Sequence, residues 1–261
     1  MRPERLRPRT RRRTRSSGGE EEGLDIAAEV SRVERKFVLE RGVAESLYGK
    51  LRKILPGDEF QGYKPYLVRS LYFDSYFDDD YFDKLDGIRD RKKIRIRIYS
   101  PEDQKAKLEL KQKQGENQHK VSLSISREQA IRMAGGDYRF LCEEDFGAGQ
   151  DLAMELYYIM TKELYRPRCI INYQRRAFAV PVNSIRITFD SHIETSEGNF
   201  DLFSPLPSLC YPADTETRLV LEVKYNHFLL SYVKDALQLQ DMTEESFSKY
   251  VAGRRYGLDD A

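Results

Sequence analysis

The sequence has few cysteines, few histidines and no long apolar run. Its three cysteines are odd in number and widely separated, and none has the spacing to another cysteine or to a histidine that a zinc site needs. This pattern is typical of a protein from a reducing compartment. The three histidines are scattered along the chain, so we expect no histidine catalysis.

No apolar stretch approaches the roughly 20 residues that a membrane-spanning helix needs, and the first residues lack the apolar core of a signal peptide. We therefore expect a cytoplasmic protein without a membrane span. The 44 lysines and arginines nearly balance the 43 aspartates and glutamates, which leaves a formal net charge of +1. Any strongly basic site must therefore come from charges that gather locally in the fold.

Residues 1–24 contain many arginines, a short Ser-Gly stretch and a run of glutamates, with almost no apolar side chain before Leu24. This composition predicts a disordered tail. An arm that binds nucleic acid is the alternative. However, no aromatic residue or folded module accompanies the arginines, so we do not expect a nucleic-acid partner. We expect residues 25–261 to form a single domain.

Residues 92–113 carry the clearest pattern in the chain, because charged and apolar side chains alternate there with a period of two. In the first half, Lys93, Arg95 and Arg97 share one face, and isoleucines at the positions between them share the other, as in a half-buried β-strand. A second alternating stretch, residues 105–113, follows a short polar connection, which predicts an antiparallel hairpin. One face of this hairpin is then lined with cations.

The plain explanation is a solvated face with lysines that guard an exposed edge. However, other predicted strands repeat the pattern with arginine, which favours bidentate contacts with oxyanions. Those strands are predicted at residues 30–39, 66–74, 119–125, 169–180, 184–193 and 218–225. Helices are predicted at residues 41–55, 151–165, 228–239 and 243–251, and Gly253 ends the last of them. A further helix is predicted to begin after a capping box of Ser126 and Gln129.

We interpret these elements as an α+β fold, in which a closed antiparallel β-barrel of about eight strands forms a polar tunnel with helices packed outside. Cations gathered in such a lumen would repel one another without a counter-charge, so the natural guest is a polyanion with several phosphates. The predicted lumen cations are Lys36, Arg69, Arg95, Arg97, Lys111, Arg175 and Arg186.

Three carboxylates, Glu34, Glu109 and Glu222, are predicted on the same faces as these cations. Carboxylate oxygens bind hard divalent cations such as Mg²⁺ or Mn²⁺ alongside phosphate oxygens. Such a set can transfer phosphoryl groups by positioning and charge stabilisation alone. For Glu34 and Glu109, the alternative is that they only orient the lysines beside them.

Eight segments of the chain occur in the order seen in a known family. They are VERKF (33–37), VRSLYFDS (68–75), KIRIRIY (93–99), KLELKQK (107–113), INYQRRAF (171–178), IRITFD (185–190), LEVKY (221–225) and SFSKY (246–250). Together they resemble the polyphosphate polymerase domain of the vacuolar transporter chaperone (VTC) family, in the triphosphate tunnel metalloenzyme (CYTH-like) superfamily. The resemblance implies synthesis of inorganic polyphosphate from the γ-phosphate of ATP, with Mn²⁺ inside the tunnel.

The strand pattern and the resemblance together define a candidate site. The candidate catalytic residues are Lys36, Arg95, Arg97, Lys111, Arg175 and Arg186, and the further phosphate-binding residues are Arg69, Lys113, Tyr173, Lys224, Ser248 and Lys249. The candidate ligands for Mn²⁺ or Mg²⁺ are Glu222, Glu109 and Glu34, and the resemblance implies that Glu222 is the principal ligand. The expected partners are ATP or triphosphate and inorganic polyphosphate.

The chain departs from the eukaryotic pattern at Ser246, where the family has a basic residue. This departure weakens the case for polymerisation more than the case for phosphate binding. The membrane spans and the accessory regulatory domain of eukaryotic members are also missing from this sequence, so we expect a stand-alone domain. Two alternatives remain open: a triphosphatase of the same fold, and a non-catalytic module that binds polyphosphate or nucleotides.

Overall fold

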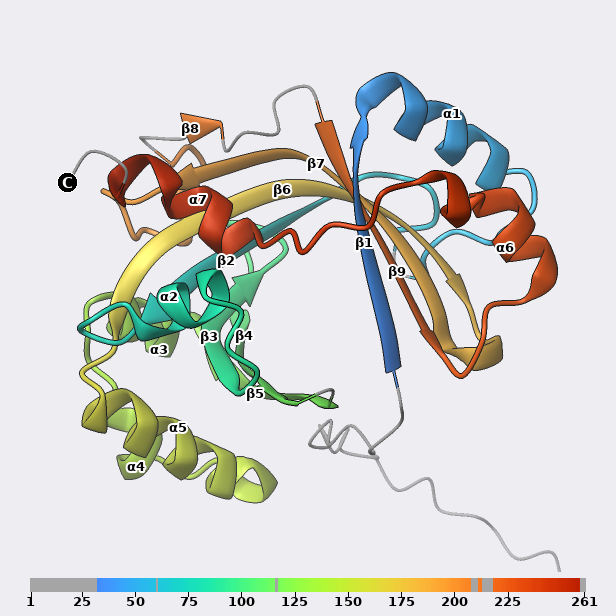
Figure 1. Cartoon of the computed structure of the whole chain (residues 1–261). Coiled ribbons are helices and arrows are strands. Elements are labelled where there is room, and N and C mark those ends of the chain that lie inside the picture. The colour runs from blue at the N-terminus through green and yellow to red at the C-terminus, as the bar shows by residue number, and fades with distance from the viewer. Residues whose placement is uncertain (1–31, 60, 116, 208–210, 213–217, 259–261) are drawn as a thin grey trace, which may run out of the picture.

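One antiparallel sheet runs through the computed structural model, which describes residues 32–59, 61–115, 117–207, 211–212 and 218–258. Its strands are β1 (Arg32–Glu40), β2 (Tyr66–Asp74), β3 (Arg91–Ile98), β4 (Lys105–Gln114), β5 (Asn117–Ser126), β6 (Arg166–Val180), β7 (Ile185–Ser196), β8 (Tyr211–Pro212) and β9 (Arg218–Asn226). The strand order is β1-β9-β7-β6-β2-β3-β4-β5, and β8 pairs with β7. Figure 1 shows that the sheet is curled and that the long, bent strands β6 and β7 connect its two sides.

Helices pack around this sheet. In the described residues they are α1 (Arg41–Leu51), α2 (Asp79–Leu85), α3 (Arg127–Ala134), α4 (Phe140–Glu143), α5 (Gln150–Lys162), α6 (Ser231–Leu237) and α7 (Lys249–Leu258). The pair α1 and α6 lies beside β1 and β9, and α3 lies beside β4 and β5 (Figure 1). The predicted capping box is confirmed at α3, because Ser126 and Gln129 exchange hydrogen bonds of 3.1 and 2.7 Å.

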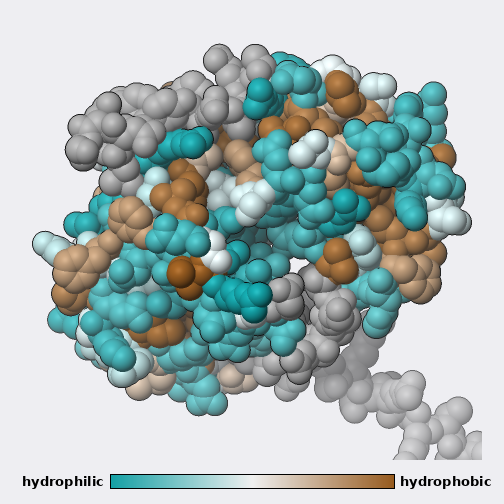
Figure 2. Space-filling model, viewed as in Figure 1, coloured by the Kyte–Doolittle hydropathy of each residue, from teal (hydrophilic) through white to brown (hydrophobic). Residues whose placement is uncertain are grey.

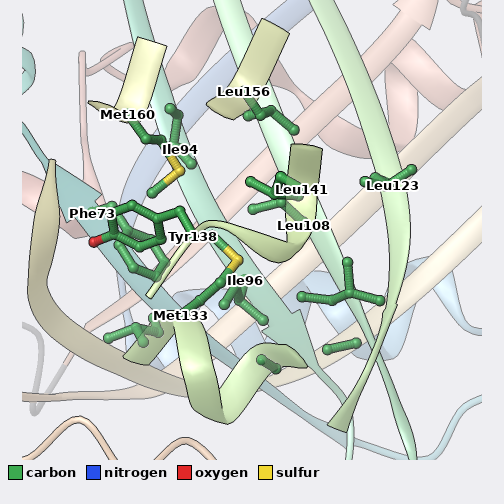
Figure 3. Packing of buried hydrophobic residues seen from close by; sticks show 14 of the residues in the cluster. Phe73, Ile94, Ile96, Leu108, Leu123, Met133, Tyr138, Leu141, Leu156 and Met160 are labelled. Carbon is green, nitrogen blue, oxygen red and sulfur yellow. The ribbon is translucent and has the colours of Figure 1, made fainter. Parts of the chain in front are cut away.

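The period-two pattern predicts the apolar face of the hairpin correctly. Ile94, Ile96 and Leu108 are fully buried, and they pack against Met133 of α3 and Leu156 of α5 (Figure 3). Each fully buried side chain of this kind stabilises the fold by about 1.5–3 kcal/mol. Helices α3 and α5 therefore cover this part of the apolar face, as the sequence predicts.

A second apolar cluster covers the other half of the sheet. Phe37 of β1, Phe189 of β7 and Leu221 of β9 are fully buried there against Leu51 of α1 and Leu237 of α6. The opposite face of the sheet carries the charged residues of the same strands. We call it the inner face.

The sheet is curled, but it is not a closed barrel within the described residues. β1 and β5 are its outermost strands, and no ladder joins them in that part of the chain. The predicted closure therefore goes beyond the structure, because strand number and face alternation do not determine whether the last two edges meet. Side chains span part of the opening, since the Lys111 ammonium on β4 lies 3.3 Å from the Glu34 carboxylate on β1.

The chain between α6 and α7 lies against the free edge of β1. The Glu245 amide donates to the Lys36 carbonyl over 2.9 Å, and Arg35 forms an ion pair with Glu244 at 2.9 Å. We call residues 244–248 the bridging segment. It leads directly into α7 and places that helix on the inner face.

The last helix differs from its prediction. The sequence predicts a helix at residues 243–251 that ends at Gly253, whereas α7 begins at Lys249 and continues through Gly253. A Cβ atom at Gly253 would lie 2.9 Å from the Thr195 hydroxyl oxygen, so glycine allows α7 to approach β7 closely. In sequence, a glycine that permits close packing looks the same as one that ends a helix.

Some predictions fall outside the described residues, among them the tail at residues 1–24 and Cys210. Of the other cysteines, Cys169 is buried and Cys142 is partly buried, and both are free thiols. Within the described part of the chain, no helix combines the length and the apolar character needed to cross a membrane.

Candidate functional site

The inner face brings most of the predicted cations together. They are Lys36 (β1), Arg95 and Arg97 (β3), Lys111 and Lys113 (β4), Arg175 (β6), Arg186 (β7), Lys224 (β9) and Lys249 (α7). Strand pairing sets Lys36 opposite Glu222 and Arg95 opposite Glu109. In the same view as Figure 1, the surface is hollowed between the two sides of the molecule, and mostly hydrophilic residues border the hollow (Figure 2).

Arg69 is the one predicted lumen cation that does not lie on the inner face. It lies on the apolar face with Leu71, and its guanidinium donates to Asn172 at 2.8 Å and to the Leu202 carbonyl at 2.9 Å. Strand alternation alone assigns it to that face. Its buried guanidinium connects β2 to the loop after β7, so the predicted place of Arg69 in the lumen is wrong.

The first charged cluster on the inner face surrounds Glu109, which is 1 % exposed. Its carboxylate lies 2.6 Å from Arg95, 3.5 Å from Arg97 and 2.7 Å from Lys120. Burial alone would raise the pKa of Glu109, but these three cations hold it well below its ordinary value. We call these four residues the Glu109 cluster. Its geometry favours the alternative role for Glu109, which is to orient the cations around it.

The second cluster surrounds Glu222, which is 7 % exposed. Its carboxylate lies 2.9 Å from Lys224, 3.2 Å from Lys249 and 3.9 Å from Lys36. Burial alone would raise the pKa of Glu222, but these lysines hold it well below its ordinary value. We call these four residues the Glu222 cluster. Its central carboxylate is therefore ionised at neutral pH.

Glu34 lies next to this cluster and is also ionised. Its carboxylate is 3.1 Å from Lys36 and 3.3 Å from Lys111. Burial raises the pKa of Glu34, but attraction to Lys224, Lys111 and Lys36 outweighs burial and lowers the pKa to about 2. Burial also lowers the pKa of Lys111 to about 8, although Glu34 opposes this shift.

Two aspartates that the site prediction missed pair with the predicted arginines. Arg175 donates two hydrogen bonds of 2.7 Å to Asp190, and the Lys249 ammonium lies 2.6 Å from the same carboxylate. Arg186 forms an ion pair with Asp58 at 2.6 Å. Asp190 shares the face of Arg186 by strand alternation, so a sequence signal for it exists. Asp58 lies in the turn after α1, where no periodicity marks it.

These carboxylates revise the electrostatic expectation. The sequence predicts cations that need an external polyanion as counter-charge, whereas Glu34, Glu109, Asp190 and Glu222 already neutralise many of them. The inner face is a network of alternating charges. A polyanion that binds there must therefore compete with internal carboxylates for the same cations.

Tyr173 supports two of the cations through its ring. The Lys249 ammonium lies 4.9 Å from the ring centre, and the Arg175 guanidinium carbon lies 5.2 Å from it. Tyr173 itself is buried, at 4 % exposure. The Tyr173 ring therefore interacts with both cations, which a ring that only packs against apolar neighbours would not do.

The bridging segment carries two lysine contacts that the site prediction did not include. Lys84 of α2 donates to the Ser246 hydroxyl at 2.5 Å, and Lys93 of β3 donates to the Ser248 hydroxyl at 2.9 Å. A lysine ammonium therefore does lie beside Ser246, and α2 supplies it. Lys93 shares the face of Arg95, so the alternation contains a signal for Lys93. No pattern marks Lys84.

A buried arginine anchors α7, which contributes Lys249 to the site. Arg254 is 1 % exposed, donates to the Tyr250 hydroxyl at 2.9 Å and lies 3.0 Å from the Asp78 carboxylate. The Tyr250 hydroxyl in turn donates to the Asp74 carboxylate. This network fixes the position of α7, whose first residue, Lys249, lies beside Glu222.

The donor set decides how a divalent cation would fit. No group of three or more His, Cys, Asp or Glu side chains in the described residues is arranged to hold a metal alone. Glu222 and Glu34 both contact Lys36, at 3.9 and 3.1 Å, and both are ionised. Two carboxylates fit Mg²⁺ or Mn²⁺ when phosphate oxygens and water complete the coordination. Glu109 fits less well, because two arginines and a lysine occupy its oxygens.

The sequence matches the VTC domain family over residues 31–256, which is most of the chain. The protein belongs to the VTC domain family. No curated protein sequence matches this VTC domain.

Two solved structures are similar to this VTC domain. One is a Hippeastrum protein assigned as an adenylyl cyclase, in which a triphosphatase activity is dominant. It is 16 % identical with a TM-score of 0.51, and the match covers 86 % of this chain and 96 % of that one. The other is a Bacillus halodurans protein assigned as an adenylate cyclase, with 14 % identity, a TM-score of 0.47 and coverage of 83 % and 93 %. The likeness to the Hippeastrum protein shows that the two proteins share a fold.

Proposed function

We propose that this VTC domain is a metal-dependent polyphosphate polymerase, which transfers the terminal phosphoryl group of ATP to a growing inorganic polyphosphate chain. The observation that carries the proposal is the Glu222 cluster, where a buried, ionised carboxylate lies within 4 Å of three lysines on a face that also presents four arginines. Phosphoryl transfer needs this combination, because it depends on positioning and on charge stabilisation.

The arginines supply the fixed part of the site. Arg95, Arg97 and Arg175 are held by carboxylates on one side, which leaves their remaining N–H groups to bind phosphate oxygens in a defined direction. Arg186 is held in the same way by Asp58 and by the Tyr66 hydroxyl at 3.0 Å. In this role the internal carboxylates orient the cations before the substrate arrives.

Glu222 and Glu34 would hold Mn²⁺ or Mg²⁺, which neutralises charge on the oxygens of the transferred phosphoryl group when it is bound. Lys36 now lies between these two carboxylates, at 3.9 and 3.1 Å. When the carboxylates hold a cation, the Lys36 ammonium is free to turn to a phosphate oxygen. Lys224 and Lys249 can do the same from the other side of Glu222.

A polyphosphate chain on the inner face would also complete the tunnel. Lys36 of β1 and Lys111 of β4 both contact Glu34 across the opening between the sheet edges. Phosphates that bind the two lysines together would join these edges through charge. The closed tunnel is in this proposal a property of the loaded domain.

Hydrolysis of triphosphate is the second candidate activity. The observation in its favour is the shared fold with the Hippeastrum protein, whose dominant activity is that of a triphosphatase. The same phosphate and metal contacts serve both reactions, and only the acceptor differs: a phosphate chain in one and water in the other.

Incubation of the purified protein with ATP and Mn²⁺ or Mg²⁺ separates these candidates. Gel electrophoresis and phosphorus NMR should reveal long-chain polyphosphate and ADP, and chelation of the metal should abolish both products. Release of orthophosphate without a polymer would instead establish hydrolysis. Unchanged ATP in the presence of either metal would contradict an enzymatic role and leave a binding module.

A further inference from the structure

Lys84 and Lys93 differ from the other inner-face lysines in their partners. Their ammonium groups donate to the Ser246 and Ser248 hydroxyls, and among the described residues no carboxylate forms an ion pair with either of them. The other lysines of the Glu34 and Glu222 region each lie within 3.3 Å of a carboxylate. These are Lys36, Lys111, Lys224 and Lys249.

The charges that face this lysine pair are mostly of the same sign. Lys93 is surrounded by Lys36 of β1, Lys84 of α2 and Lys111 of β4, and Asp80 of α2 opposes them more weakly. Burial and this repulsion lower the pKa of Lys93 to about 7. Cations held together without a carboxylate gain stability when an anion binds between them.

The groups around the lysine pair can donate hydrogen bonds to an anion. The Ser248 hydroxyl lies at the N-terminus of α7 and is 3.4 Å from the Val251 amide. A seryl hydroxyl donates as readily as it accepts, so Ser246 and Ser248 can turn from the ammonium groups to phosphate oxygens. The first turn of α7 adds the positive end of a helix dipole.

The lysine pair also leads outward from the site. The Lys249 side chain is 9 % exposed beside Glu222, Lys93 and Ser248 are half-buried, and Ser246 is exposed. An anion that leaves the Glu222 cluster along this line meets Lys93 first and Lys84 second. The two lysines therefore suit successive groups of a chain better than one compact anion.

We propose that Lys84 and Lys93, together with the Ser246 and Ser248 hydroxyls, bind the phosphates of a polyphosphate chain that is too long for the inner face alone to hold. This inference rests on the proposed function and assigns the direction of the chain. The polymer leaves the inner face between α2 and the bridging segment.

Equilibrium binding to the full chain, without ATP, tests this assignment. Inorganic triphosphate and size-fractionated long-chain polyphosphate are each titrated into the parent, Lys84→Met and Lys93→Met by calorimetry. Lys53→Met is the matched control, because Lys53 is an exposed lysine in the turn after α1. Loss of a charge-assisted contact should weaken binding of the long chain by about tenfold in each variant.

The comparison between the two ligands decides the result. Lys84→Met should weaken triphosphate binding by about twofold or less, as Lys53→Met should for both ligands. The dependence of long-chain affinity on salt should also lose about one unit of slope for each lysine removed.

Equal losses for both ligands would overturn the inference, since Lys84 would then belong to the triphosphate site. A parent protein that binds the long chain no more tightly than triphosphate would overturn it as well. The proposed function fails separately, through absence of turnover with ATP and metal. The comparison of triphosphate and long-chain affinities does not depend on that outcome, because it is measured without ATP.

Discussion

Glu109 and Glu222 occupy equivalent settings on opposite halves of the inner face, yet their partners differ in kind. Both carboxylates are buried, and each lies within 4 Å of three cations. Glu109 is held by two arginines and a lysine, whereas Glu222 is held by three lysines. The comparison separates a carboxylate that is fixed from one whose partners can be exchanged.

The difference follows from the side chains. An arginine guanidinium is planar and always charged, and it keeps several N–H groups in a rigid fork, so it stays in place while it binds a second oxyanion. A lysine ammonium is a point charge on a flexible stem and can turn from a carboxylate to a phosphate. Glu109 therefore suits the role of an anchor, and Glu222 suits the role of a metal ligand.

The largest expected effect is on turnover. Glu222→Gln keeps the shape of the side chain but removes the charge that would hold a divalent cation, so metal-dependent turnover should fall by at least about 100-fold. Steady-state rates at increasing Mn²⁺ concentration measure this loss. Triphosphate binding without metal should persist, because the lysines around Glu222 remain.

Glu109→Gln is the matched control for that experiment. Its turnover should fall less than that of Glu222→Gln and should keep the parent's dependence on Mn²⁺ concentration, because in the proposed function Glu109 orients Arg95 and Arg97 and Glu222 binds the metal. Equal losses of turnover in the two variants at saturating metal would remove the distinction between the clusters.

The second effect is on stability. Glu109→Gln leaves Arg95 and Arg97 without their buried counter-charge, which should lower the free energy of unfolding by about 3–5 kcal/mol. Urea denaturation measures the change. Triphosphate should then raise the melting temperature of this variant by more than it raises that of the parent, since the ligand replaces the missing charge. A variant as stable as the parent would show that Glu109 is no anchor.

Much of this arrangement follows from local sequence rules. The alternation of Arg95 and Arg97 with Ile94 and Ile96 assigns each side chain to a face, because a strand has a period of two and only one face can be covered by helices. The same rule places Arg69 on the apolar face. Arg69 is mispredicted only when its charge is given more weight than its position.

The remaining features depend on contacts between distant segments. Lys84 reaches Ser246 and Asp58 reaches Arg186 across more than 100 residues of sequence, and neither Lys84 nor Asp58 lies in a periodic strand. The role of Gly253 depends on how closely α7 packs on β7. The open edge between β1 and β5 is a property of the whole sheet, which no single strand encodes.

Lys93 differs from the cations of the Glu109 and Glu222 clusters, because it forms no ion pair with a carboxylate among the described residues. Burial, together with repulsion from Lys36, Lys84 and Lys111, lowers its pKa from 10.5 to about 7. Between these two values the unfolded chain holds a proton that the folded protein does not hold. Folding then releases a proton, so this group makes stability rise as the pH increases from 7 towards 10.

Lys93→Met should therefore be more stable than the parent near pH 7, by about 1 kcal/mol or more, which corresponds to a rise of about 2–4 °C in Tm. The gain should shrink as the pH approaches 10, because the unfolded parent also loses its proton there. Thermal unfolding at a series of pH values measures both trends, with Lys53→Met as the control for the loss of one positive charge. Lys249 contrasts with Lys93, since its pKa is raised by Asp190 and Glu222 in spite of burial. A Lys93→Met protein that is less stable than the parent at pH 7, with the pH dependence unchanged, would mean that Lys93 is compensated in the same way as the lysines around Glu222.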